Sequence, residues 1–158
     1  YLFDVWKELN LSDAKLCLYG AIGKYEKNVI LKQIELTPNV EHMGYTPMEE
    51  IYQGAYALVH PTLTGGFEKV SFEAMAAGLP VITTPIAAHY HVDGETALII
   101  EPGNKDQLKA AILKLHEDEG LAAQLAENGK KTIADKSWDR FGEDFKAIVE
   151  KIIADEQV

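Results

Sequence analysis

Three charged side chains lie close together in a part of the sequence that is otherwise uncharged. Residues 51–92 contain only three charges, Glu68, Lys69 and Glu73, whereas the other 116 residues contain 37. Because charges are rarely buried without partners, this pattern favours an apolar core that opens onto one polar cleft. The alternative is that all three side chains lie on the exposed face of one helix.

A glycine-bearing loop precedes these charges. Residues 61–67, with the sequence PTLTGGF, join a predicted strand at 57–60 to a predicted helix at 70–77 that carries Glu73. In open α/β sheets, ligands bind at the carboxyl ends of the strands, and the free N–H groups of a helix N-terminus attract phosphate. The loop would therefore suit a nucleotide diphosphate. The alternative is a plain connection whose glycines only make a turn.

Other motifs are weaker indications of chemistry. Residues 20–23 (GAIG) lack the glycine spacing and the later acidic residue of a dinucleotide site. His89 and His91 are two residues apart, as metal ligands in a strand can be, but the sequence offers no third ligand. Ser71 and Cys17 lack the neighbouring sequence of an activated nucleophile. We therefore expect no metal site and no serine or cysteine nucleophile.

Composition and charge exclude several classes of protein. The 158 residues are about one domain in length, and 47% apolar with 25% charged residues is ordinary for a globular protein. A net charge of −10 argues against nucleic acid or anionic lipid as the main partner. The single cysteine rules out an internal disulfide, and no signal peptide or membrane helix is predicted. Because a single cysteine suits a reducing compartment, we expect a cytoplasmic protein, and because the chain starts at Tyr1 without an initiator Met, we expect a fragment of a longer one.

Predicted helices and strands alternate through the first hundred residues. The strands show little alternation of apolar and polar residues, which is typical of a parallel sheet covered on both faces by helices. The sequence therefore predicts a doubly wound α/β fold. The predicted strands are at 15–20, 40–43, 57–60, 80–84 and 97–100.

Local signals predict where several helices begin and end. Thr46 and Glu49 flank a proline and a methionine as in a capping box, so a helix should begin there. Gly78 should end the helix at 70–77, and Asn104 with Gln107 should cap the first of the later helices.

The last predicted helix is amphipathic. Ser137 should cap it, and Phe141, Phe145, Ile148 and Ile152 fall on one face. We expect the C-terminal third of the chain to form an α-helical layer against the sheet.

Three stretches of sequence carry a family resemblance. Residues 39–45 (NVEHMGY) and 57–62 (ALVHPT) resemble two strand motifs of the family, and residues 73–82 (EAMAAGLPVI) match its E-A-M-A-x-G-x-P-V-I stretch nearly residue for residue. Over residues 39–102 the chain resembles the C-terminal, nucleotide-sugar-binding domain of retaining glycosyltransferases of the two-Rossmann-domain (GT-B) type, specifically glycosyltransferase family 4, the group 1 glycosyltransferases. Looser matches at 15–20 and at Ser137–Trp138 extend the resemblance to nearly the whole chain.

The resemblance implies that residues 1–158 form a single Rossmann-like domain that binds a nucleotide sugar. This domain would belong to a longer, two-domain enzyme that makes a polysaccharide, a glycolipid or a glycoconjugate. Such an enzyme transfers a sugar from a nucleotide-diphosphate donor to a glycan, lipid or small-molecule acceptor, with retention at the anomeric carbon and without an essential metal or cofactor. The acceptor, and any membrane at the cytoplasmic face, would contact the N-terminal domain outside these residues. The fragment alone would then be inactive.

The same resemblance implies roles for individual residues. Glu73 falls on the second glutamate of the family's E-x7-E motif, which holds the donor ribose hydroxyls. A carboxylate suits this role because it can accept two hydroxyl hydrogen bonds. Gly66 and Phe67 fall on the pair whose backbone amides face the sugar and the diphosphate, and Lys69 and Val70 open the helix behind them.

Two positions depart from the family pattern. Gly65 stands where the family has its first glutamate, which binds the transferred sugar, and Glu68 replaces a glycine. Glu68 is therefore the candidate catalytic replacement, Lys69 a candidate phosphate contact, and Tyr45 a further candidate substrate-binding residue. The alternative function is a non-catalytic nucleotide-sugar-binding or assembly module with a degenerate motif. A nucleotide-sugar epimerase is less favoured because it would lack the 73–82 pattern.

Overall fold

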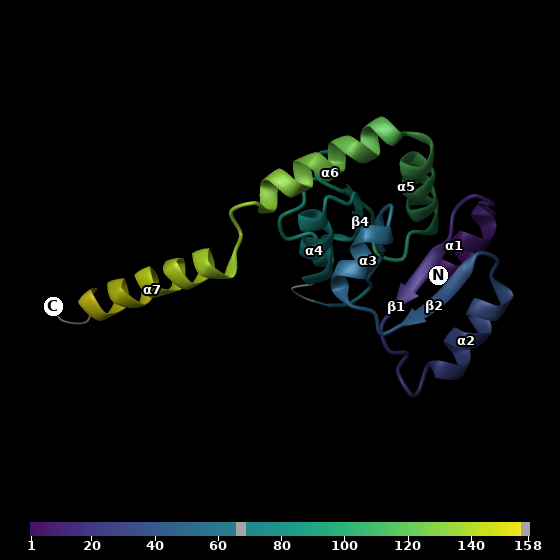
Figure 1. Cartoon of the computed structure of the whole chain (residues 1–158), viewed down its shortest axis with the longest axis horizontal. Coiled ribbons are helices and arrows are strands. Elements are labelled where there is room, and N and C mark those ends of the chain that lie inside the picture. Colours follow the sequence, from purple (N-terminus) through teal and green to yellow (C-terminus); the bar gives the residue numbers. More distant parts are fainter. Residues whose placement is uncertain (66–68, 156–158) are drawn as a thin grey trace.

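The computed structural model describes residues 1–65 and 69–155 and shows helices alternating with strands, as the sequence predicts (Figure 1). The elements, in chain order, are α1 (Leu2–Leu9), β1 (Leu16–Tyr19), α2 (Lys27–Leu36), β2 (Val40–Gly44), α3 (Met48–Gly54), β3 (Leu58–His60), α4 (Lys69–Ala77), β4 (Val81–Thr83), the short 3-10 helix η1 (Pro85–Ala87), β5 (Leu98–Ile99), α5 (Lys105–Glu117), α6 (Glu119–Ile133) and α7 (Trp138–Asp155).

All paired strands are parallel, which confirms the predicted α/β class. β1 pairs with β2, and β3, β4 and β5 pair in that order. The described strands thus form two hydrogen-bonded sheets where the sequence predicted one. An apolar run indicates that a strand is buried, but it does not indicate which other strand pairs with it at the usual spacing of about 4.8 Å. The sequence therefore could not predict that the strands divide into two sheets.

Helices cover both faces of the three-stranded sheet. Successive residues of a strand point to opposite faces. Ile82 and Leu98, which are paired in register, join a buried cluster with residues of α1, α5 and α6. Val81 joins a second cluster with Ala74 and Met75 of α4, against which α3 and α6 also pack. This arrangement is the predicted doubly wound one.

The predicted helix boundaries at Asn104 and Gly78 follow their sequence signals. The Asn104 side chain accepts a hydrogen bond from the Gln107 backbone N–H at 3.0 Å, so Asn104 caps α5 as predicted. Gly78 follows α4 with φ +77°, and its N–H donates to the carbonyl of Met75. The N–H of Leu79 donates to Ala74 in addition, which completes a Schellman motif and ends α4 at a defined place.

The predicted capping box at Thr46 is wrong. The N-cap of α3 is Pro47, and no side chain caps this helix. Thr46 lies one residue too early for the motif, and its hydroxyl points back to the carbonyl of Met43, 3.5 Å away. The proline therefore occupies the cap position and not the first helical position.

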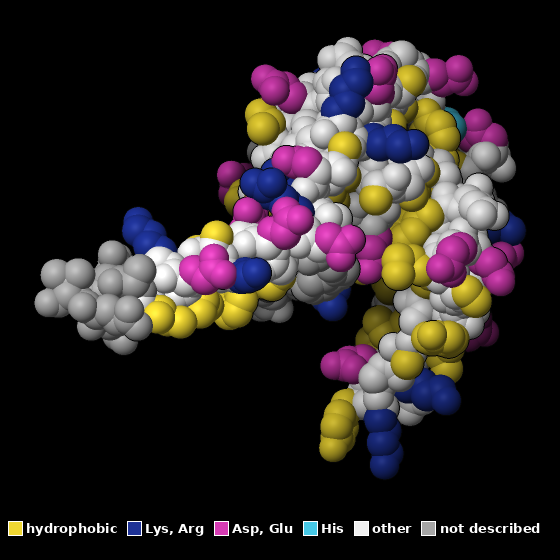
Figure 2. Space-filling model, turned by 60° about the vertical axis from the view of Figure 1, so that its left-hand side comes forward, with side chains coloured by type: hydrophobic (Ala, Val, Ile, Leu, Met, Phe, Trp, Pro, Cys, Tyr) yellow, Lys and Arg dark blue, Asp and Glu magenta, His cyan; other side chains and the backbone are white. Residues whose placement is uncertain are grey.

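The last helix departs from the prediction. α5 packs against α1 and β4, and α6 packs against α4, so these two helices form the expected helical layer. In contrast, α7 extends away from the body of the molecule (Figure 1), and its apolar residues lie along one side of the projecting arm (Figure 2). Phe141, Phe145, Ile148 and Ile152 are 53–61% exposed. Amphipathic periodicity predicts an apolar face but not the surface that this face contacts.

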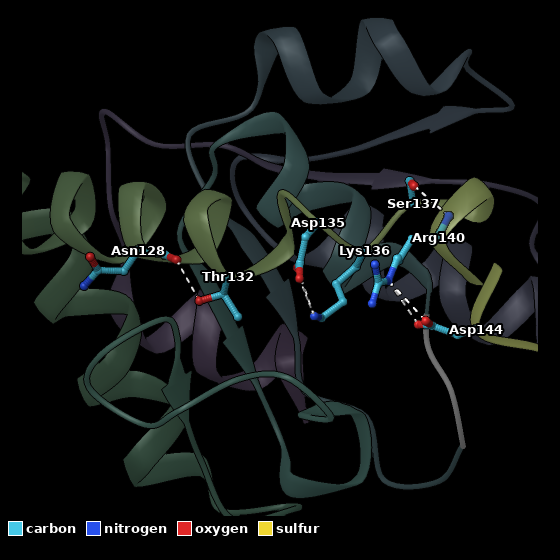
Figure 3. Close-up of polar contacts among 7 residues, drawn as sticks. All are labelled: Asn128, Thr132, Asp135, Lys136, Ser137, Arg140 and Asp144. Carbon is cyan, nitrogen blue, oxygen red and sulfur yellow. Dashed lines mark hydrogen bonds and ion pairs between the residues drawn. The ribbon is translucent and has the colours of Figure 1, made fainter. Parts of the chain in front are cut away.

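Short-range polar contacts lie on both sides of the junction between α6 and α7 (Figure 3). Ser137 caps α7 as predicted, because its hydroxyl oxygen accepts a hydrogen bond from the Arg140 backbone N–H at 3.1 Å. The Arg140 side chain in turn pairs with Asp144 one turn later, at 3.2 Å. In the described part of the chain, no helix combines the length and the apolarity that crossing a membrane requires.

Candidate functional site

The loop that follows β3 is fixed at its start. The backbone carbonyl of Thr62 accepts a hydrogen bond from the Thr84 hydroxyl at 3.0 Å, and the carbonyl of Pro61 accepts one from the Tyr1 hydroxyl at 2.8 Å. Thr84 directly follows β4, and Tyr1 directly precedes α1. The carboxyl end of β3 is therefore tied to two other parts of the fold before the loop leads to α4.

Gly65 has a backbone conformation that only glycine adopts without strain. Its φ is +144°, outside the regions that residues with a Cβ favour. A glutamate at this position, as in the family pattern, would be strained in the same backbone. Gly66, Phe67 and Glu68 follow immediately but lie outside the described residues, so their roles remain predictions.

α4 carries the other residues that the sequence singled out. Lys69 and Val70 form its exposed first turn, and Glu73 lies one turn later with a half-buried side chain. Residues four apart share one face of a helix, so Lys69 and Glu73 present a cation and a carboxylate on the same side. Ala74 and Met75 are fully buried and anchor the helix beneath them.

The structure adds Tyr52, which the sequence analysis missed. The hydroxyl of Tyr52 in α3 donates to Glu73 Oε2 at 3.0 Å and lies 3.3 Å from the carbonyl oxygen of Val70. Burial, and next the hydrogen bond to the Glu73 carboxylate, raise the pKa of the Tyr52 hydroxyl well above its usual value. The two residues are 21 positions apart, and no helical or strand period connects them.

Comparisons with known proteins identify the family. A family model described as glycosyl transferases group 1 matches residues 1–118, which is most of the chain. The chain belongs to the group 1 glycosyl transferases. The resemblance seen at residues 39–102 is thereby confirmed at the level of the family.

Individual members of the group 1 glycosyl transferases agree with this assignment. The chain is 31% identical to an uncharacterized glycosyltransferase of Methanocaldococcus jannaschii over 144 residues, which is 88% of the chain and 40% of that protein. It is 39% identical to the capsular polysaccharide biosynthesis glycosyltransferase CapM of Staphylococcus aureus over 87 residues, 54% of the chain and 23% of CapM. The chain thus spans less than half the length of these relatives.

A solved structure supports the fold. The crystal structure of Anabaena HepE in complex with UDP-glucose superimposes with a TM-score of 0.80 at 20% identity, covering 97% of the chain and 44% of HepE. At this identity the likeness concerns the fold alone. The Rossmann-like, GT-B-type arrangement that the sequence predicted is borne out.

Tyr45, the remaining candidate of the group 1 pattern, lies apart from α4. It follows β2, in the two-stranded sheet, and its side chain is 93% exposed. It makes no hydrogen bond or ion pair with any other described residue. Its predicted contact with substrate therefore remains a prediction.

A shallow hollow lies at the carboxyl ends of β1 and β2. Its volume is about 280 Å³, and the turn at residues 20–23 forms part of its wall. His42 lines the same hollow and donates through Nε2 to the Gly20 carbonyl at 2.8 Å. This hollow adjoins the two-stranded sheet, whereas Glu73 lies on α4, beside the three-stranded sheet.

The two histidines that suggested metal ligands have different surroundings. His89 is exposed, whereas His91 is 8% exposed, and neither ring nitrogen of His91 makes a hydrogen bond of normal geometry with a described residue. Across residues 1–65 and 69–155, no three His, Cys, Asp or Glu side chains gather as metal ligands would.

The buried His91 should make stability depend on pH. Burial lowers its pKa below the ordinary value of 6.5, and a weaker interaction with the Thr96 backbone opposes only part of this shift. At pH values between the lowered pKa and 6.5, the unfolded chain therefore binds a proton that the folded chain does not. The free energy of unfolding should fall as the pH drops from 7 to 5, by up to about 1.4 kcal/mol per pH unit from this group. Urea unfolding of His91→Phe should show a shallower dependence than the unsubstituted chain.

His89→Phe is the matched control for this measurement, because it changes an exposed histidine two residues away. It should keep the original pH dependence. Equal slopes for His91→Phe and the unsubstituted chain would contradict the assignment.

Proposed function

We propose that the chain is the donor-binding domain, and the C-terminal half, of a retaining family 4 glycosyltransferase. The full-length enzyme would transfer a sugar from a nucleotide-diphosphate donor to a glycan, lipid or small-molecule acceptor. The observation that carries the proposal is the half-buried carboxylate of Glu73, held one turn inside α4, the helix that follows the loop after β3.

The arrangement suits the chemistry of a nucleoside diphosphate. A carboxylate offers acceptors for two ribose hydroxyls. The N-terminal end of α4 carries the partial positive charge of a helix dipole, which favours the diphosphate, and Lys69 adds a full positive charge there. Charge that develops on the departing diphosphate would be stabilised at this helix end. The proposal extends to the Gly66 and Phe67 amides and to Glu68 as the catalytic carboxylate.

The relatives support the choice of substrates. CapM is named for capsular polysaccharide biosynthesis, and HepE was crystallised with UDP-glucose. By analogy, the donor is a sugar linked to a nucleoside diphosphate, and the acceptor is a growing glycan or a lipid-linked one. Because the chain spans less than half of its relatives, acceptor binding and any membrane contact are assigned to a further, N-terminal domain. The proposal places the enzyme in the cytoplasm and requires no essential metal.

A second candidate function rests on Gly65. The backbone there favours glycine and not the glutamate that binds the transferred sugar in the family pattern. A domain that binds a nucleotide sugar without turning it over would tolerate this change. Glu68 distinguishes the two functions, because an active enzyme requires it to supply the missing carboxylate.

Isothermal titration calorimetry on the full-length protein tests the proposal. UDP, GDP, ADP and their common sugar conjugates would each be titrated into it. Selective binding of one nucleotide, tightened by one attached sugar, would support the donor site. Turnover that is lost in Glu68→Gln, with donor binding kept, would support the catalytic function over the second candidate. Failure of every nucleotide to bind the folded protein would refute donor binding.

A further inference from the structure

α3 packs against α4, the helix that carries Glu73 (Figure 1). Tyr52 lies in α3, and its ring packs against the buried cluster that contains Ala74 and Met75. The ring therefore has a defined position, and its hydroxyl lies 3.0 Å from Glu73 Oε2. A side chain anchored in the core thus reaches the one carboxylate assigned to the donor ribose.

The Tyr52 hydroxyl stays protonated and can always donate a hydrogen bond. Burial and the Glu73 carboxylate both raise the pKa of this hydroxyl, so it keeps its proton throughout the physiological range. The Val70 carbonyl oxygen, 3.3 Å away, is the alternative acceptor for the single hydroxyl proton and also belongs to α4. A carboxylate accepts hydrogen bonds but cannot donate them, so the direction of the bond is fixed.

The hydrogen bond leaves most of the Glu73 carboxylate free for a ligand. Two carboxylate oxygens offer about four acceptor positions, and Tyr52 occupies one of them, on Oε2. Among the described residues, no other group donates to the Glu73 carboxylate. A half-buried glutamate without this bond would have to be immobilised when the ligand binds, which weakens binding.

We propose that Tyr52 is a positioning residue, which holds the Glu73 carboxylate in the orientation that receives the donor ribose hydroxyls. The inference rests on the proposed function of Glu73 and adds to it the group that orients Glu73 before the donor arrives. Tyr52 itself is not assigned any contact with the donor.

Tyr56 provides a matched control. Its hydroxyl also donates a long-range hydrogen bond, to the Leu115 carbonyl at 3.0 Å, but it contacts α5 and not α4. Tyr52→Phe and Tyr56→Phe each remove one hydroxyl and keep the ring. Any general effect of losing a tyrosine hydroxyl bond should therefore appear in both variants.

A double-mutant cycle on the full-length protein tests the inference. Calorimetry would measure the affinity for the nucleoside diphosphate that the protein selects, in Tyr52→Phe, Glu73→Ala, the double variant and Tyr56→Phe. We expect Tyr52→Phe to weaken binding about 2- to 10-fold and to have no further effect when Glu73 is already alanine. Tyr56→Phe should bind as tightly as the unsubstituted protein.

Two affinity results would overturn the inference. One is unchanged affinity in Tyr52→Phe beside a clear loss in Glu73→Ala, and the other is an equal loss from Tyr52→Phe in both backgrounds, which would indicate packing and not positioning. NMR scalar couplings that report the χ1 rotamer of Glu73, measured without ligand, separate this inference from the proposed function. A single rotamer that becomes averaged in Tyr52→Phe supports the positioning role even if no nucleotide binds, and an unchanged rotamer refutes it.

Discussion

Replacing Glu73 by alanine in the full-length protein is expected to weaken binding of the donor nucleotide by about 1–3 kcal/mol, or about 5- to 150-fold. The substitution removes the carboxylate of α4 that is proposed to accept hydrogen bonds from the donor ribose. The fold should tolerate the change, because the Tyr52 hydroxyl keeps the Val70 carbonyl as an alternative acceptor. Calorimetric titration with the selected nucleotide, beside a urea unfolding curve for each protein, measures both effects.

Glu117→Ala is a suitable control for this experiment. Glu117 is an exposed glutamate at the end of α5, outside the proposed site. It should leave the nucleotide affinity unchanged. If Glu73→Ala bound the nucleotide as tightly as this control, the assignment of Glu73 to the ribose would fail.

Replacing Met75 by alanine should cost the fold about 2–5 kcal/mol of unfolding free energy. Met75 is fully buried on the face of α4 opposite the solvent, in the cluster with Leu79 and Val81. It also packs against Gly129 of α6, where an added Cβ would lie 3.4 Å from Met75 Cγ. Truncation would leave a cavity between α4, β4 and α6 that these packed elements cannot close. Urea unfolding at constant pH measures the loss.

Met48→Ala is the matched control, because Met48 is 45% exposed at the start of α3. It should change the unfolding free energy much less. At temperatures where Met75→Ala remains folded, its nucleotide affinity should fall less than that of Glu73→Ala, since it removes packing and no ligand-binding group. Equal stability of the Met75 and Met48 variants would show that α4 is not anchored as the structure indicates.

Much of the fold was predictable because its signals are local. Apolar runs indicated the strands, Asn104 bonds to a backbone group three residues away, and Gly78 takes a conformation that few other residues tolerate. Glu73 was predictable for a different reason, since it stands in a stretch that matches a family motif nearly residue for residue. The sequence signal for each of these features lies within about ten consecutive residues.

The sequence by itself determined the α/β class, the family and the candidate residues around Glu73. Tertiary structure alone decided that α7 projects from the body, that the described strands pair in two sheets, and that Tyr52 bonds to Glu73. The physical reason is the range of the interactions. Periodicity and capping involve residues three or four apart, whereas a strand's partner, a helix's contact surface and a hydrogen bond between α3 and α4 depend on where distant parts of the chain come to lie.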